Sequence, residues 1–176
     1  MKPLALITGV GPGTGASVAR RFAAAGYRTA LLARNEKRLN ALASELPDSK
    51  AIVCDVTDSE ALARAVEAAG PVDVVVHNAV GGGWGTFSEI EPAMLENNFQ
   101  VNVMALLHLA RLTTPSMVQA GKGALIVTGN TSALRGRAPF AGFAPTKAAQ
   151  RILAESMARE LGPKGCLLYT SPSPRD

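Results

Sequence analysis

The chain has 176 residues, of which 47% are hydrophobic and 18% are charged, a composition typical of one folded domain. Its net charge of +4 is modest and its basic residues are scattered, so we expect no nucleic-acid partner. No apolar run reaches the roughly 18 residues that cross a bilayer, so we expect no membrane association.

Strand patterns and helix patterns alternate from the first residues onward. Buried-strand patterns predict strands over residues 4–8, 29–33, 51–54, 72–76 and 124–128. Helical spacing predicts helices over residues 16–25 and 39–46, after the capping-box pair Thr57 and Glu60, and over residues 92–120 and 140–161. Helices between consecutive strands imply right-handed crossovers, so the predicted fold class is α/β, a Rossmann-type doubly wound parallel sheet.

The pattern changes after residue 165. Residues 166–176 contain two Ser-Pro pairs and show no core periodicity. Because proline cannot donate to a β-ladder, we expect neither a strand nor a helix there. We therefore expect an incomplete domain over residues 1–165 and a foreign tail over 166–176, which resembles translated sequencing-adapter sequence. The fifth strand would then be an exposed apolar edge.

A glycine-rich loop joins the first predicted strand to the first helix. It reads Thr8-Gly9-Val10-Gly11-Pro12-Gly13-Thr14-Gly15. Glycines let a backbone approach a pyrophosphate closely, and a helix N-terminus supplies free N–H groups. A flexible turn without a ligand is the alternative, but the position between a strand and a helix favours a dinucleotide site.

The glycine loop has the spacing T-G-x-x-x-G-x-G. With three later segments, which follow in the order that the family has them, it resembles the short-chain dehydrogenase/reductase family over residues 1–165. These segments are Cys54-Asp55-Val56, His77-Asn78-Ala79-Val80-Gly81 and Phe99-Gln100-Val101-Asn102. The second departs from the family's N-N-A-G turn at His77 and Val80. Read singly, Asp55, Asn78 and Asn102 have plainer roles as a turn former, a loop residue and a polar group on a helix surface.

The resemblance implies roles for these residues. Asp55, with Val56 beside it, would contact the adenine ring, and Asn78 and Ala79 would line the cofactor site. Asn102 would kink the long helix and hold a water in a proton relay. The family's sheet has seven strands, of which about five are expected here. The family also implies a carbonyl or alcohol substrate and a homodimer or homotetramer of the complete protein.

The residue after the second strand distinguishes between the two dinucleotides. An acid at that position binds the ribose 2′-hydroxyl of NAD, whereas an arginine accommodates the 2′-phosphate of NADP. The chain has Arg34 there, which favours NADP(H), although Glu36 lies nearby. An ordinary surface arginine is the alternative. The two cysteines match no metal spacing, so we expect no metal and a reducing, cytoplasmic location.

The resemblance departs from the family at the catalytic positions. The family's Y-x-x-x-K becomes Phe143 to Lys147, so the lysine that binds the nicotinamide ribose is present and the tyrosine hydroxyl is not. Asn130 stands at the position of the serine, with Thr131 and Ser132 as neighbours that supply hydroxyls. The chain is therefore expected to be an NADP-preferring oxidoreductase with altered catalytic residues. The alternatives are a dinucleotide-binding sensor or partner subunit, or an inactive fragment.

Overall fold

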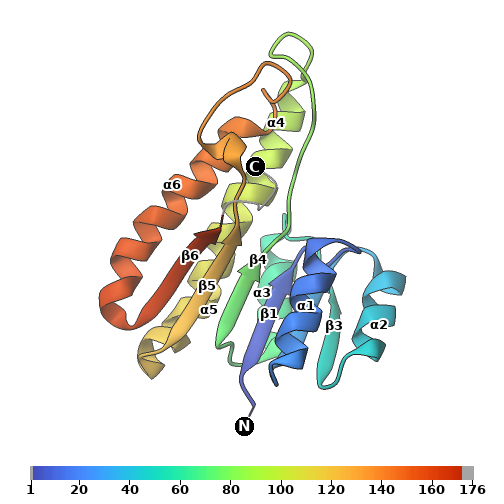
Figure 1. The fold of residues 1–176 in the computed structure, drawn as a ribbon, viewed down its shortest axis with the longest axis vertical. Helices are drawn as coiled ribbons and strands as arrows, with labels where there is room; N and C mark the ends of the chain where they lie inside the picture. The colour runs from blue at the N-terminus through green and yellow to red at the C-terminus, as the bar shows by residue number, and fades with distance from the viewer. Residues whose placement is uncertain (1, 172–176) are drawn as a thin grey trace.

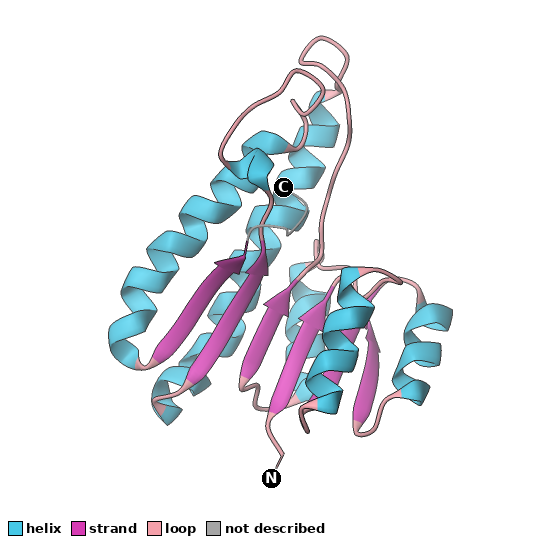
Figure 2. Cartoon of the chain, viewed as in Figure 1, coloured by secondary structure: helices cyan, strands magenta, loops and turns pink. Residues whose placement is uncertain are grey.

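Six parallel strands form one sheet in the order β3-β2-β1-β4-β5-β6, with helices on both faces (Figures 1 and 2). The structure is a computed structural model that describes residues 2–171. The strands are β1 (Leu4–Thr8), β2 (Arg28–Ala33), β3 (Ser49–Val53), β4 (Val74–His77), β5 (Gly123–Thr128) and β6 (Cys166–Ser171). The α/β class and the parallel sheet predicted from the sequence are confirmed.

Helices cover both faces of the sheet, and each face supplies its own apolar side chains because alternate residues of a strand point to opposite sides. Leu4 and Leu6 pack into a core with α3, α5 and α6, whereas Ala5 and Ile7 pack with α1 and α2. The helices are α1 (Thr14–Ala24), α2 (Glu36–Glu45), α3 (Ser59–Ala69), α4 (Pro92–Phe99), α5 (Ala105–Ala120) and α6 (Ala144–Leu161). In the described part of the chain, no helix has both the length and the apolarity that a membrane crossing needs.

Residues 166–171 form a strand, so the expectation of neither strand nor helix was wrong there. β6 pairs in parallel with β5 along its whole length, and β5 is therefore an interior strand and not the edge. Cys166 is buried and Leu168 packs on the core while Leu167 is 74% exposed, an alternation that the sequence reading overlooked. The remaining residues of the expected tail, 172–176, lie outside the described part of the chain.

One predicted helix cap was wrong, whereas the helix predicted over residues 92–120 is present and contains an irregular turn. Asp58, and not Thr57, caps α3, because the Asp58 carboxylate accepts from the main-chain N–H groups of Glu60 and Ala61 at 3.0 and 2.9 Å. The single helix predicted over residues 92–120 consists of α4, a π-helical turn at Gln100–Met104 and α5. A π turn widens the helix and often occurs at a functional site.

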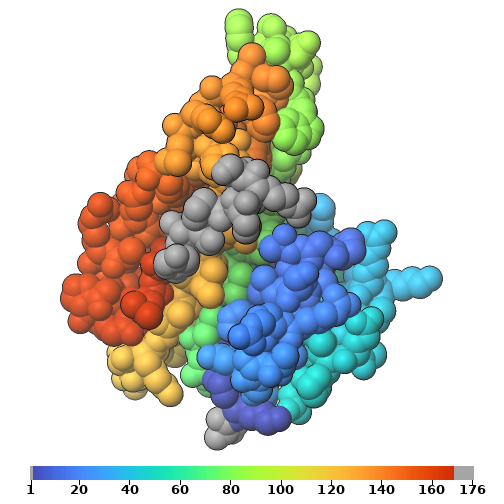
Figure 3. Space-filling view, viewed as in Figure 1, coloured from blue at the N-terminus to red at the C-terminus, as the bar shows by residue number. Residues whose placement is uncertain are grey.

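Two loops project beyond the strand ends (Figure 1), and their residues lie in the green and orange top of the space-filling view (Figure 3). The loop between β4 and α4 meets the loop between β5 and α6, where the main-chain N–H of Gly85 donates to the carbonyl of Pro139 at 2.9 Å. Trp84 packs edge-on against Phe140 with ring centroids 4.5 Å apart, yet it is 71% exposed. The last helix starts at Ala144, later than predicted, because the preceding residues form these turns.

Candidate active site

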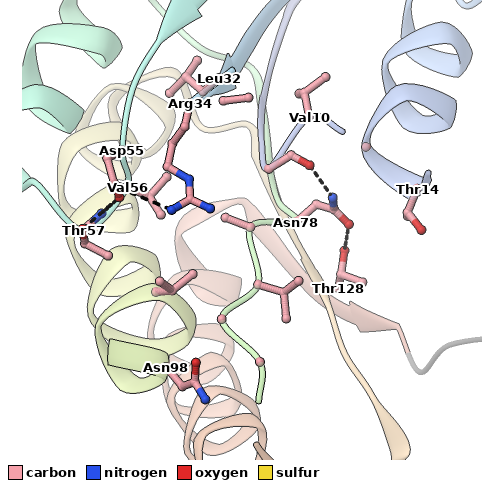
Figure 4. Close-up of a pocket in the computed structure, with 18 of the residues that line it drawn as sticks. Val10, Thr14, Leu32, Arg34, Asp55, Val56, Thr57, Asn78, Asn98 and Thr128 are labelled. Carbon is pink, nitrogen blue, oxygen red and sulfur yellow. Dashed lines mark hydrogen bonds and ion pairs between the residues drawn. The ribbon is translucent and has the colours of Figure 1, made fainter. Parts of the chain in front are cut away.

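A cleft of about 860 Å³ lies at the carboxyl ends of the strands, where the order of the sheet reverses between β1 and β4 (Figure 4). Open α/β sheets bind ligands at such a switch point. The cleft draws residues from segments far apart in the sequence. Its lining includes Gly9, Thr14, Gly15, Arg34, Asp55, Val56, Asn78, Ala79, Asn130, Phe143 and Lys147, all of which the sequence predicted as site residues.

The glycine loop forms one wall of the cleft, and its glycines fall into two groups. Gly9 has a φ of +68°, and a Cβ there would lie 2.4 Å from the Cα of Ala79. A Cβ on Gly15 would lie 2.5 Å from the carbonyl oxygen of Gly9. Gly11 and Gly13, in contrast, face open space. The inner glycines therefore allow tight packing, and the outer ones leave room for a ligand next to the backbone.

The loop leads directly into the N-terminus of α1. Gly13 is the N-cap residue of this helix, and in the described chain no side chain caps it. Thr14 starts the helix and lines the cleft. Main-chain N–H groups at such a helix start, with the positive end of the helix dipole, favour an anion.

Asn78 connects three parts of the cleft (Figure 4). Its amide donates to the carbonyl oxygen of Gly9 at 2.9 Å, and its amide oxygen accepts from the hydroxyl of Thr128 at 3.0 Å. The hydroxyl of Thr8, at the end of β1, accepts from the main-chain N–H of Ala79 at 3.3 Å. The ends of β1, β4 and β5 are thus joined by side chains as well as by the sheet.

Arg34 and Asp55 lie at the outer end of the cleft (Figure 4). The guanidinium of Arg34 is 3.9 Å from the carboxylate of Asp55, and the Arg34 side chain is 81% exposed. The main-chain N–H and hydroxyl of Thr57 donate to Asp55, and with Arg34 they hold the pKa of that carboxyl below its ordinary value. Arg34 precedes Asn35, the N-cap residue of α2, so its charge lies outside the helix.

Buried polar groups lie at the inner end of the cleft and directly behind its lining. Asn102, in the π turn, is fully buried; its amide donates to the carbonyl of Gly81 and to the hydroxyl of Thr146, both at 2.8 Å. Lys147 is 4% exposed, and its ammonium donates to the carbonyl of Thr128 at 2.7 Å. Burial lowers the pKa of Lys147 to about 8. A positive charge is therefore held at the end of the cleft near neutral pH.

His77 lies beneath this group, at the end of β4. It is 1% exposed, and one ring nitrogen, Nδ1, lies 3.1 Å from the hydroxyl of Thr8. Burial, aided by the positive charge of Lys147, lowers the pKa of His77 to about 4. The imidazole is therefore neutral at pH 7 and adds no second charge beside the lysine.

The two altered catalytic positions differ in their surroundings. The side-chain oxygen of Asn130 accepts from the main-chain N–H of Ser132 at 2.8 Å, so it caps the short helix at Thr131–Ala133. Phe143 is the residue just before α6; its ring lines the cleft and lies 6.5 Å from that of Trp84, centroid to centroid. An apolar ring therefore lines the cleft where the family has its tyrosine.

Three buried polar residues of this region were missed by the sequence reading. Thr146 accepts from Asn102 and donates to the carbonyl of Phe143 at 2.8 Å. Asn98 donates to the carbonyl of Gly142 at 2.8 Å and lines the cleft. Gln150 follows Lys147 by three residues. This spacing places both on one helix face and could have indicated their contact from the sequence.

The family model described as short chain dehydrogenase matches residues 3–170. D-erythrulose reductase of Gallus gallus is 34% identical over 160 residues, which are 90% of this chain and 65% of that protein. A short-chain dehydrogenase from Streptomyces avermitilis superimposes with a TM-score of 0.93 at 30% identity, covering 97% of this chain and 64% of the other. A metagenomic short-chain oxidoreductase solved in complex with NADP superimposes with a TM-score of 0.91 at 28% identity. The match covers 97% of this chain and 81% of the other. The chain thus spans just under two thirds of the length of the curated relative.

Proposed function

The chain belongs to the short chain dehydrogenase family, and from this premise we propose that it binds NADP(H) as the cofactor-binding part of an oxidoreductase. The reaction would transfer hydride between the nicotinamide and a carbonyl or alcohol substrate. The cleft at the switch point carries this proposal. It has a glycine loop and an uncapped helix start on one wall, an arginine at its outer end and a lysine at its inner end.

The size and chemistry of the cleft fit a dinucleotide. Its volume of about 860 Å³ lies in the range of small-molecule sites. The open space beside Gly11 and Gly13 suits the pyrophosphate, which the N-terminus of α1 would attract. Arg34 would bind the 2′-phosphate, and Lys147 the nicotinamide ribose. The remaining residues proposed to contact the cofactor are Thr8, Gly9, Thr14, Gly15, Asp55, Val56, Asn78 and Ala79.

The bound cofactor would supply the hydride. The chemistry also requires a proton, which must come from another group. Lys147 lines the cleft and Asn102 lies buried behind it, but Phe143 has no hydroxyl and cannot act as a general acid or base. The amide of Asn130 retains an N–H donor that suits a substrate carbonyl. Phe143 therefore favours a second candidate function, a dinucleotide-binding sensor or partner subunit with little catalysis.

For the complete protein we propose a homodimer or homotetramer in the cytoplasm. Apolar side chains on the outer surfaces of the helical layer support association: Phe99, Leu112 and Ile152 are each about 40–50% exposed on α4, α5 and α6.

The preference for NADP(H) predicts the effect of Arg34→Ala. The variant is expected to bind NADPH roughly 10- to 100-fold more weakly, because a charge-assisted hydrogen bond contributes about 1.5–3 kcal/mol. Its affinity for NADH should stay within about twofold, since a 2′-hydroxyl carries no charge for the guanidinium to meet. Calorimetric titration with both cofactors measures the difference. Arg64→Ala, on α3, removes the same charge as a control, and an equal loss for NADPH and NADH in Arg34→Ala would refute the assignment.

A further inference from the structure

The ammonium of Lys147 has a defined set of partners inside the protein. Of its three N–H donors, one meets the carbonyl of Thr128 and one meets the side-chain oxygen of Gln150. Within the described residues these are the hydrogen bonds that it makes to protein atoms. Lys147 also lines the cleft. The third N–H donor is thus left for an oxygen atom of a ligand in the cleft.

Gln150 joins the lysine to the π turn. Its side chain is 2% exposed; the amide oxygen accepts from Lys147, and the amide nitrogen donates to the main-chain carbonyl of Asn102 at 2.8 Å. The side chain of Asn102 in turn holds Gly81 and Thr146. Both ends of the Gln150 amide are satisfied, so the side chain has one orientation and fixes the ammonium with it.

We propose that Gln150 is the positioning residue for Lys147, holding the ammonium at the inner end of the cleft while leaving its charge uncompensated for an oxygen-rich ligand. This inference rests on the proposed function in that the ligand is the ribose end of NADP(H). A carboxylate in the place of the amide would hold the lysine equally well but would cancel its charge. An amide accepts the hydrogen bond and stays neutral at every pH of interest.

The groups that face Lys147 come from three elements. α6 contributes Gln150, β5 contributes the carbonyl of Thr128, and β4 contributes His77, while the π turn acts through the Asn102 carbonyl that binds Gln150. His77 is the titratable side chain among them, and its pKa of about 4 keeps it neutral above pH 5. The charge state of Lys147 therefore responds to whatever replaces Gln150.

The test compares Gln150→Glu with Gln150→Met. The first adds a negative charge, and the second keeps the shape but removes the hydrogen-bond acceptor. Titration of the lysine ¹³Cε NMR signals, with the Lys147 signal assigned by its loss in Lys147→Arg, reports the pKa without any cofactor. We expect the Lys147 pKa to rise by about one or more in Gln150→Glu and to fall by about one in Gln150→Met. Gln119→Glu, exposed on α5, adds the same charge elsewhere as a control.

Opposite shifts of the Lys147 pKa in the two variants support the positioning role. If Gln150 served in packing alone, the Lys147 pKa would stay unchanged in both variants or would shift in the same direction in both. An unchanged Lys147 pKa in both variants, or in the single variant that folds, overturns the positioning role. NADPH titration at pH 7.5 is the second readout, with about a tenfold loss of affinity expected in Gln150→Met. Opposite pKa shifts in a protein that binds no NADPH at any pH would refute the proposed function and leave the positioning role standing.

Discussion

Phe143→Tyr is expected to raise NADPH-dependent reduction of a carbonyl substrate by about 100-fold or more, since a positioned general acid contributes about 10²–10⁴ in rate. Phe143 lies just before α6 and its ring lines the cleft, four residues from Lys147. A tyrosine hydroxyl on that ring would lie in the region of the buried ammonium, whose charge favours the phenolate and lowers the phenol pKa.

The loss of NADPH absorbance with a panel of ketones and aldehydes measures this gain. Phe140→Tyr is the matched control, because it adds the same hydroxyl to a neighbouring ring that packs on Trp84. We expect no gain there. A Phe143→Tyr variant that binds NADPH like the parent but reduces no substrate faster would show that the missing hydroxyl is not what limits the chemistry.

Gly9→Ala is expected to lower the free energy of unfolding by about 3 kcal/mol or more. The new methyl would overlap the backbone of Ala79 at 2.4 Å, and the φ of +68° is itself unfavourable for alanine. Backbone atoms cannot move aside as a flexible side chain does, so the ends of β1 and β4 would have to separate. Urea unfolding followed by circular dichroism measures the loss.

Gly11→Ala is the matched variant in the same loop. Its methyl would face open space, so the free energy of unfolding should change by less than about 1 kcal/mol. The methyl would occupy room proposed for the pyrophosphate, and NADPH affinity should fall about tenfold. If Gly9→Ala unfolded at the same urea concentration as the parent, the close approach of the loop to Ala79 would be wrong. An unchanged NADPH affinity in Gly11→Ala would move the pyrophosphate elsewhere.

The sequence predicted the features that depend on local pattern. Strands β1, β2, β4 and β5 followed from short apolar runs, and the glycine loop from its place between a strand and a helix. The residues predicted for the cofactor site came from segments that end parallel strands. Because such strand ends meet at one edge of the sheet, their convergence on one cleft could be anticipated without coordinates.

The features that the sequence reading missed depend on tertiary contacts. The sequence alone predicts an irregular tail at β6, because the apolar pattern there is short and next to Ser-Pro pairs. The strand forms through pairing with β5. Asp58 and Thr57 are both good N-cap residues, and only the geometry shows which one accepts the hydrogen bonds. The bridge through Gln150 needs a carbonyl from the π turn, which is 48 residues away.

Thermal unfolding of the 176-residue chain with and without NADPH and NADH shows whether the cleft is a formed NADP(H) site. The prediction is one cooperative transition that NADPH raises by several degrees and NADH raises less, because a ligand at about 100 times its Kd stabilises a protein by about 2.7 kcal/mol. A cooperative transition that neither cofactor moves, at millimolar concentration, would show that the cleft is not a formed NADP(H) site.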